Sequence, residues 1–442
     1  MKCIILALLI LTQVFTGAAA TESLHRFDKT IPLWQALNTA VQNNPKIQGR
    51  MADWDALIEK YREVTGLPDP VFNITYFPSP IETRLGPQDY NVTLSQGIPF
   101  PGKLNKKGRI VEKQILAAKG ELEREIKTIR TRVIASYAEL SYIQTAREVA
   151  AKNMALIDAL LVEATQRYAQ NTENTDKAQL IDVMRAKSQR GQTAYDILLL
   201  ERLENTQKAD LNALMNRPPD APIGQTEPVE IRPLHLSESE LFEKAREHND
   251  TIKISSARVA TAEAGVDLAE TRGQPDFRLG LFYAGIGEAE MNVEDSGKDA
   301  VGVQLGITIP LWSGKNRGSK LAALHKKKAA EARKQDAENQ IMTRISKARF
   351  TLENASRLIE LYETDLLPQS LGALNSSELW YRENKASFSD FLEARSVVHN
   401  FQLALARARA DYVKTLAELE TLTGISLVSV PAPIGEEAGH AH

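Results

Sequence analysis

The feature that most limits the possible folds is a long helical run from about Lys103 to Tyr168. It contains no proline, and Gly120, next to Lys119, is a weak point well inside it. At a rise of 1.5 Å per residue, such a helix spans on the order of 100 Å, which exceeds the diameter of a globular domain. The run therefore predicts a rod.

Apolar residues recur along this run in steps of three, four and four residues. The positions are Ile115, Ala118, Leu122, Ile126, Ile129, Val133, Tyr137 and Leu140. A period of eleven residues corresponds to nearly straight or right-handed winding, unlike the heptad of a left-handed coiled coil. The period suits helices laid side by side around a tube. The helix alone is equally compatible with a free-standing coiled-coil stalk.

The chain also repeats itself, and this sets its domain organisation. Each copy has an opening helix ended by glycine and proline, a pair of strands, a sharp bend and a long helical hairpin. The hairpins turn near 170–177 and 383–387, and the second rod contains Pro368. The predicted units are a signal peptide 1–20, a first repeat 21–217, a proline-rich connector 218–235, a second repeat 236–424 and a disordered tail 425–442.

Both strand pairs alternate apolar residues with polar or small ones, which is the period of a half-buried strand. The apolar positions that we expect to face lipid are Phe72, Ile74, Tyr76, Tyr90, Val92 and Leu94 in the first pair, and Leu279, Leu281, Tyr283, Val303, Leu305 and Ile307 in the second. A half-buried sheet of a soluble protein shows the same alternation. In this chain, however, the remaining segments that could bury the apolar face are long helices that pack against each other. Four strands cannot close a barrel, which needs about eight. We therefore expect several subunits to share one barrel.

The first twenty residues have the pattern of a secretory signal peptide. Lys2 is followed by an apolar run from Cys3 to Val14 and by small residues at 18–20. Cys3 is the single cysteine of the chain, so no disulfide or thiol site is expected in the exported protein. Beyond this segment no stretch of about 18 apolar residues occurs, so we expect any membrane crossing to use strands.

Charge and motifs argue against nucleic-acid binding and against catalysis. Lys and Arg number 54 against 57 Asp and Glu, so no basic footprint for nucleic acid exists. Gly97 to Lys103 has the spacing of a phosphate-binding loop, but two prolines remove backbone donors and Leu104 replaces the magnesium-binding hydroxyl. No HExxH motif or serine triad is recognisable. We expect a protein that is no enzyme and has no cofactor and no metal site.

Two acidic or histidine-containing segments have plain explanations. His440 and His442 follow Glu436 and Glu437 near the end of the chain. They could capture a cation weakly, but a flexible tail explains them equally well. A second acidic group lies between two strands and suits a solvated hairpin loop: Glu288, Glu290, Glu294, Asp295 and Asp299.

The tandem repeat of helix, strand pair, bend and helical hairpin resembles the TolC family of outer-membrane efflux proteins. The bends read IPFPGK and IPLWSGK, which look most like the CusC and CzcC type that serves heavy-metal resistance pumps. The resemblance implies a mainly α fold with a small β part. Long helical hairpins form a trimeric α-barrel tunnel, and four strands per subunit join a shared 12-stranded transmembrane β-barrel.

The resemblance also implies partners and a location. The family is a homotrimer in the outer membrane lipid that extends into the periplasm, where a periplasmic adaptor (membrane fusion protein) joins it to an inner-membrane RND-type transporter. The expected function is passive export of small toxic solutes, including heavy-metal cations. A type I protein-secretion duct would share the whole pattern, and a soluble periplasmic coiled-coil scaffold or adaptor would share the rods.

A periplasmic gate is implied by the same resemblance. Tyr381 matches the family's gate tyrosine and Asp182 its aspartate, while the family arginine falls on Ala386, with Arg382 and Lys385 nearby. Asp390 and Glu393 are further acidic candidates, and acidic side chains around a narrow pore favour cations. Asp182 and Asp390 could instead complement the dipoles of the returning helices.

Overall fold

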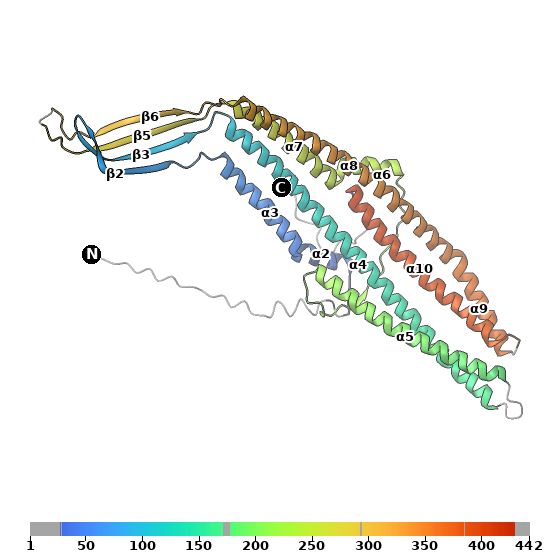
Figure 1. Cartoon of the computed structure of the whole chain (residues 1–442). Helices are drawn as coiled ribbons and strands as arrows, with labels where there is room; N and C mark the ends of the chain where they lie inside the picture. The colour runs from blue at the N-terminus through green and yellow to red at the C-terminus, as the bar shows by residue number, and fades with distance from the viewer. Residues whose placement is uncertain (1–26, 28, 171–176, 292–293, 384, 429–442) are drawn as a thin grey trace, which may run out of the picture.

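The computed structural model describes residues 27, 29–170, 177–291, 294–383 and 385–428. The molecule is elongated, with a four-stranded sheet at one end and, at the other, the helix ends near residues 170, 177, 382 and 388 (Figure 1). Within the described residues, no helix combines the length and apolar character needed to cross a membrane. The predicted signal peptide 1–20 and the histidines His440 and His442 lie outside the described residues.

The first repeat supplies one strand pair and one helical hairpin. Its elements are β1 (Thr30–Ile31), α2 (Leu33–Asn43), α3 (Pro45–Thr65), β2 (Val71–Thr83), β3 (Gly86–Ile98), α4 (Lys103–Gln170) and α5 (Lys177–Leu214). α4 is the predicted rod, and its apolar seam is fully buried at Ile129, Val133 and Tyr137.

The second repeat follows the same order. Its elements are β4 (Gln225–Thr226), α6 (Glu238–His248), α7 (Asp250–Glu270), the 3₁₀ turn η2 (Thr271–Gly273), β5 (Phe277–Ile286), β6 (Ala300–Ile307), α8 (Ser313–Leu361), the π-helical turn η3 (Tyr362–Leu366), α9 (Leu367–Arg382) and α10 (Phe388–Thr423). The π turn ends at Leu366, and Pro368 is the second residue of α9, where its missing N–H cannot donate the hydrogen bond that a continuous helix requires. β6 ends at Ile307, the last apolar position predicted for this strand.

The opening helix of each repeat is broken, whereas the sequence predicted one continuous helix. Asn44 and Asn249 are extended and cap α3 and α7 through their side-chain oxygens. Their side-chain amides also donate to distant carbonyls, Asn44 to Leu214 at 2.9 Å and Asn249 to Leu422 at 2.8 Å. Each break therefore ties its opening helices to the last turn of the hairpin in the same repeat.

The sheet has the strand order β2-β3-β5-β6, and all neighbours are antiparallel. One row of paired residues joins Phe72, Leu94, Leu281 and Val303, and the next joins Ile74, Val92, Tyr283 and Val301. Tyr76 pairs with Tyr90, and Leu279 with Leu305. Because residues two apart share a face, the registers bring the predicted apolar positions onto one side of the sheet.

The predicted bend after the first strand pair ties the two repeats together. The Phe100 backbone N–H donates to the Asp276 carboxylate at 2.8 Å, and Lys103 Nζ pairs with the same carboxylate at 2.8 Å. Lys103 Nζ also donates to the Gln274 carbonyl at 3.0 Å. Residues 97–103 therefore form the bend between β3 and α4, and Lys103 in this bend pairs with Asp276 of the second repeat.

The main core lies at mid-length, where β1 pairs with β4 in parallel. Tyr137 of α4 anchors this region, because its buried hydroxyl donates to the Ile31 carbonyl and accepts the Glu227 N–H, both at 2.7 Å. The connector 218–235 is therefore more than a linker, since it contains β4 and buries Ile223 in the core. The prediction of disorder from residue 425 is wrong for 425–428, where Val428 is buried.

Candidate functional site at the helical tip

The tip is built by the ends of α4 and α9 and the beginnings of α5 and α10, which meet far from the sheet (Figure 1). A small apolar cluster holds these ends together. Its buried members are Leu160, Ala186, Leu374, Tyr381, Phe388, Phe391 and Val398. The cluster combines residues of both helical hairpins, so it couples the two repeats at the end of the rod.

Tyr381 is at the centre of this cluster. Its ring stacks on Phe391 with centroids 5.9 Å apart and lies 5.6 Å from Phe388. The Arg167 guanidinium from α4 lies over the ring, 4.6 Å from the centroid, and also pairs with Glu163 at 2.8 Å. Burial raises the pKa of Tyr381, and the nearby Arg167 charge partly opposes this effect.

Asp182 belongs to the electrostatic surroundings of Tyr381. It lies in the second turn of α5, and its charge contributes to the raised pKa of the tyrosine. Its carboxylate is 4.0 Å from the Arg185 guanidinium, and its side chain is 26% exposed. The structure thus brings together the aspartate and the tyrosine that the sequence predicted for the gate.

The two basic gate candidates, Arg382 and Lys385, form ion pairs with residues close to them in sequence. Arg382 donates to Glu378 at 2.6 Å, one helical turn back. Lys385 pairs with Glu383 at 2.7 Å. These are exposed contacts, which contribute little to stability.

Asp390 has a defined structural role at the start of α10. It forms a capping box with Ser387: its carboxylate accepts the Ser387 N–H at 3.0 Å, and its own N–H donates to the Ser387 hydroxyl. These hydrogen bonds hold the pKa of Asp390 below its usual range. The helix-end interpretation therefore applies to Asp390, whereas Glu393 is simply exposed.

Three arginines join the two hairpins, and the sequence did not reveal them as functional candidates. Besides Arg167 on Tyr381, Arg185 of α5 donates to the Ser389 hydroxyl of α10, and Arg395 of α10 donates to Asn153 of α4 at 3.1 Å. The resemblance places a gate arginine at Ala386, whereas in this structure the three arginines bring positive charge to the tip from other positions of the helices. A local signal existed for Arg167, which has Glu163 one turn before it, and for Arg185, which has Asp182 three residues before it.

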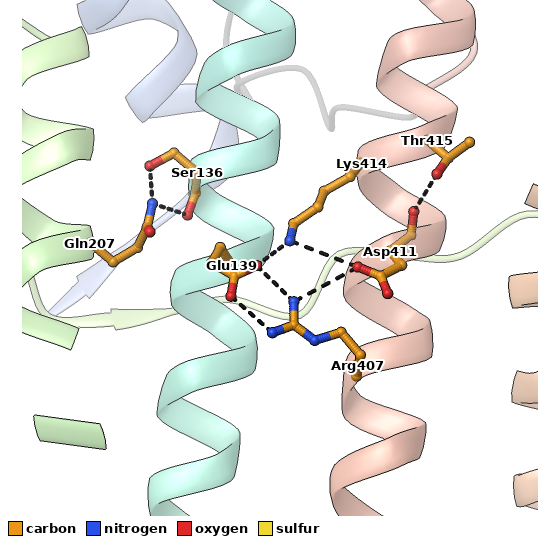
Figure 2. Close-up of polar contacts among 7 residues, drawn as sticks. All are labelled: Ser136, Glu139, Gln207, Arg407, Asp411, Lys414 and Thr415. Atoms are coloured by element: carbon orange, nitrogen blue, oxygen red, sulfur yellow. Dashed lines mark hydrogen bonds and ion pairs between the residues drawn. The ribbon is translucent and has the colours of Figure 1, made fainter. Parts of the chain in front are cut away.

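A stronger polar network crosses from α4 to α10 at mid-length (Figure 2). Arg407 binds the Glu139 carboxylate through two nitrogens, at 2.8 and 3.1 Å, and Lys414 contacts the same carboxylate. Asp411 lies 3.8 Å from both cations. Burial alone would raise the pKa of Glu139, but hydrogen bonds and charge from Arg407 and Lys414 outweigh it and hold the pKa below its usual range.

The main cavity of the molecule is not at the tip. It has a volume of about 1080 Å³ and lies beside the connector, between α4, α10 and η3, with Tyr142, Arg409 and Glu363 in its wall. In the described part of the chain, no three His, Cys, Asp or Glu side chains are grouped to hold a metal ion. The acidic loop residues Glu288, Glu290, Glu294, Asp295 and Asp299 form no such group.

Comparison with known proteins finds a family model that matches part of this chain and solved structures that resemble its fold. The model of the family described as outer membrane efflux protein matches residues 241–425. The second repeat carries an outer membrane efflux protein domain. No curated protein matches the sequence.

Several solved structures share the fold of most of this chain. They include the outer membrane protein VceC from Vibrio cholerae, with 21% identity over 89% of this chain and 96% of that chain at a TM-score of 0.73. CusC has 14% identity over 89% and 92% at 0.74. The open state of the Neisseria gonorrhoeae MtrE outer membrane channel has 16% identity over 89% of each chain at 0.72.

These comparisons confirm several predictions. The efflux domain and the shared fold confirm the resemblance to TolC-type channels and the mainly helical fold class. The second repeat is therefore similar to an outer membrane efflux protein domain, and the whole chain has the fold of outer-membrane channels.

Proposed function

We propose that three copies of this chain form a passive outer-membrane duct for the last step of an efflux system. The observation that carries the proposal is the four-stranded sheet, which has an apolar face and two edges, β2 and β6, without partners among the described residues. Tyr76, Val303 and Leu305 on that face are 70%, 68% and 85% exposed. Large apolar side chains in such numbers require lipid or protein to cover them.

Unpaired edges and an uncovered face are both resolved by a shared barrel. An open sheet with long unpaired edges is an aggregation risk, and closure into a barrel removes the edges. If β6 of one copy pairs with β2 of the next, three copies close a barrel of twelve strands whose apolar face meets lipid. The opposite face carries small and polar residues, including Asn73, Thr93, Gln304 and Gly302, as a water-filled lumen requires.

Aromatic residues mark both ends of the apolar band. Tyr76 and Tyr90 pair in the middle part of β2 and β3, Tyr283 lies near the loop end of β5, and the rings of Tyr90 and Tyr283 are 6.2 Å apart. Trp312, 77% exposed, lies where β6 gives way to α8. Tyrosine and tryptophan favour the two membrane interfaces, so this spacing supports a membrane-spanning sheet.

The rods place the tip far from the membrane, where partners can reach it. Channels of this family are homotrimers that work with a periplasmic adaptor and an inner-membrane pump. We assign this chain the same partners, with an RND-type transporter supplying the energy. The duct itself does no chemical work.

The tip contacts support a gate at Tyr381. Its ring is sandwiched between Phe391 and Arg167, and Asp182 lies close enough to influence it electrostatically. Opening separates the α4 and α5 hairpin from the α9 and α10 hairpin, which breaks the Arg167, Arg185 and Arg395 contacts. Asp182 and Glu393 attract cations to this end, so small toxic cations, heavy metals among them, are the proposed cargo.

Fractionation of the expressed full-length protein tests the function. Detergent extracts of the outer membrane are run unheated and heated on a denaturing gel, and their mass is measured by light scattering. We expect a trimer from the outer membrane that dissociates on heating. A soluble periplasmic monomer or dimer would show that the protein is a scaffold.

A further inference from the structure

One charged side chain lies among the paired residues of the sheet. In the rows that join residues of three or four strands, Arg278 of β5 is the only charged residue. It is exposed, and it lies one row from the rod end of the sheet, between Gly97 of β3 and Gly306 of β6. Each copy of the sheet therefore carries one positive charge at this level.

The registers place Arg278 on the small and polar face of the sheet. Paired residues of antiparallel strands share a face, and so do residues two apart on one strand. Arg278 therefore shares a face with Gly280 and with the partner of that glycine, Gln304. A charged side chain on the lipid face would destabilise a membrane barrel, so this placement agrees with a water-filled lumen.

Glycines surround Arg278 on its own face. Gly97 and Gly306 are its cross-strand partners, and Gly280 is the next residue of β5 on that side. A Cβ atom at position 306 would lie 3.3 Å from the Arg278 Cβ, whereas one at position 97 would meet nothing within 4 Å. Because no neighbouring side chains crowd it, the long Arg278 side chain has room to extend into the lumen.

The Arg278 charge is not neutralised within the sheet. Among the described residues, its guanidinium has neither an ion pair nor a hydrogen bond. The nearest carboxylate along the chain is that of Asp276, two residues before it. That carboxylate is already held by Lys103 Nζ and by the Phe100 N–H, at 2.8 Å each. Asp276 therefore compensates Arg278 little.

The repeat accounts for the other carboxylate near this level, that of Asp69. Asp69 is the equivalent of Asp276, because each follows glycine and proline just before a strand pair. In the proposed barrel, β2 meets β6 of the next copy as β5 meets β3, so Asp69 faces the second bend and its exposed Lys315. Position 278 itself corresponds to Val71, which adds no charge. Three copies therefore bring three uncompensated arginines to one level.

We propose that three Arg278 side chains, one from each copy, form a positively charged ring inside the barrel at its rod end, and that this ring selects anions. The proposal rests on the proposed homotrimeric duct and goes beyond it by assigning an ion preference to the barrel lumen. Rings of Arg or Lys favour anions in pores, as rings of Asp or Glu favour cations. Guanidinium groups bind carboxylate and phosphate groups well, so solutes that carry these groups are enriched here.

The ring has the opposite charge to the acidic side chains proposed at the tip. The tip raises the local concentration of cations and the barrel that of anions, so the two ends of the duct favour ions of opposite sign. A bare cation is repelled at the Arg278 level. A cation cargo therefore passes this level more readily with a bound anionic ligand than alone.

The ion preference can be measured as a reversal potential. Purified trimers are placed in a planar lipid bilayer between two potassium chloride solutions of different concentration, and every protein carries Tyr381→Ala to keep the tip open. At about 0.1 M salt, Arg278→Gln should raise the permeability of potassium relative to chloride roughly two- to fivefold, and the rise should shrink at about 1 M because screening is stronger. Arg278→Lys keeps the charge and should leave the ratio near that of the parent.

The matched control is Arg84→Gln, which removes the same charge from the turn between β2 and β3. Arg84 is exposed, and its turn lies ~35 Å from the Arg278 level along the strands, several times the screening length. The reversal potential of this control should match that of the parent.

The outcomes separate the ring from the duct. The heat-dependent trimer on a denaturing gel shows that each variant has folded. An unchanged permeability ratio for Arg278→Gln, in a trimer that gives current steps, overturns the ring and leaves the duct standing. An absence of current steps from every protein overturns the duct, and the ring with it.

Labelling of engineered cysteines tests the position of the side chain separately. Cys3 is the single cysteine of the chain and lies in the predicted signal peptide, so Arg278→Cys and Leu279→Cys each introduce one thiol into the exported protein. In trimers reconstituted into lipid vesicles, a charged, membrane-impermeant maleimide should label Arg278→Cys several times faster, because Leu279 faces lipid. Equal rates, or faster labelling of Leu279→Cys, would overturn the placement of Arg278 in the lumen.

Discussion

The middle of the rod and its tip both join α4 to α10, but they do so by different means. At mid-length, Glu139 receives two bonds from Arg407 and a contact from Lys414, next to a large buried core. At the tip, the helices share a small apolar cluster, a cation–π contact of Arg167 with Tyr381, and single hydrogen bonds such as that from Arg395 to Asn153. The network of Glu139, Arg407, Lys414 and Asp411, here called the Glu139 network, suits a fixed contact at mid-length, whereas the tip has the weaker interactions of a contact that can open.

The largest expected effect is the loss of stability when the Glu139 network is broken. Glu139→Gln leaves Asp411 as the carboxylate beside Arg407 and Lys414, and removing one partner of a partly buried charge network should cost about 2 kcal/mol of unfolding free energy. The measurement is thermal unfolding by circular dichroism in detergent. Glu353→Gln, which removes an exposed pair with Arg349, is the control and should change the midpoint little.

A slightly smaller loss of stability is expected when the uncharged Tyr137 hydroxyl, at the mid-length core, is removed. Tyr137→Phe removes a buried hydroxyl that bonds Ile31 and Glu227, and it leaves two backbone groups unpaired at a cost of about 1.5 kcal/mol. Tyr195→Phe, at an exposed ring, is the control. Equal midpoints for the two variants would show that β1 and the connector are not held by this hydroxyl.

Low pH should reduce the stability that the Glu139 network contributes. Because the folded-state pKa of Glu139 is below its ordinary value of 4.5, the stability it contributes is present above pH 4.5 and is lost as the pH falls through the folded value. Wild-type protein should therefore lose more of its unfolding midpoint below pH 4.5 than Glu139→Gln does. Parallel acid profiles for the two proteins would contradict the assignment.

The smallest effect on stability is expected at the tip. Arg167→Ala removes a cation from the Tyr381 ring, which should cost less than about 1 kcal/mol at this partly exposed site. Closure should nevertheless loosen, and cells should become more sensitive to a bulky antibiotic that the outer membrane normally excludes. Arg190→Ala, which removes an exposed pair with Asp158 on the same hairpin, should leave sensitivity unchanged.

The rods and strand pairs could be predicted because their signals are local. Period and length identified α4, and alternation identified the faces of β2 and β6 before any pairing was known. The breaks at Asn44 and Asn249 could not be predicted fully, because their amides are fixed by Leu214 and Leu422, which lie far along the chain. Proline follows only the first of these two asparagines.

The contacts at the helical tip could be predicted only in part for the same reason. Tyr381 and Asp182 follow from the family resemblance, whereas Arg167, Arg185 and Arg395 act across hairpins that are distant in sequence. Nothing near Arg167 indicates that its guanidinium covers an aromatic ring. Likewise, β4 is too short to be recognised, and its pairing with β1 depends on the folded core.

Conductance is the most direct test of a passive duct with a closing tip. Purified trimer is added to a planar lipid bilayer without nucleotide or partner protein, and single channels of wild type, Tyr381→Ala and Arg167→Ala are recorded. We predict discrete current steps for all three, small in the wild type and larger in both variants. An absence of steps in every protein would contradict the account of this chain as a channel.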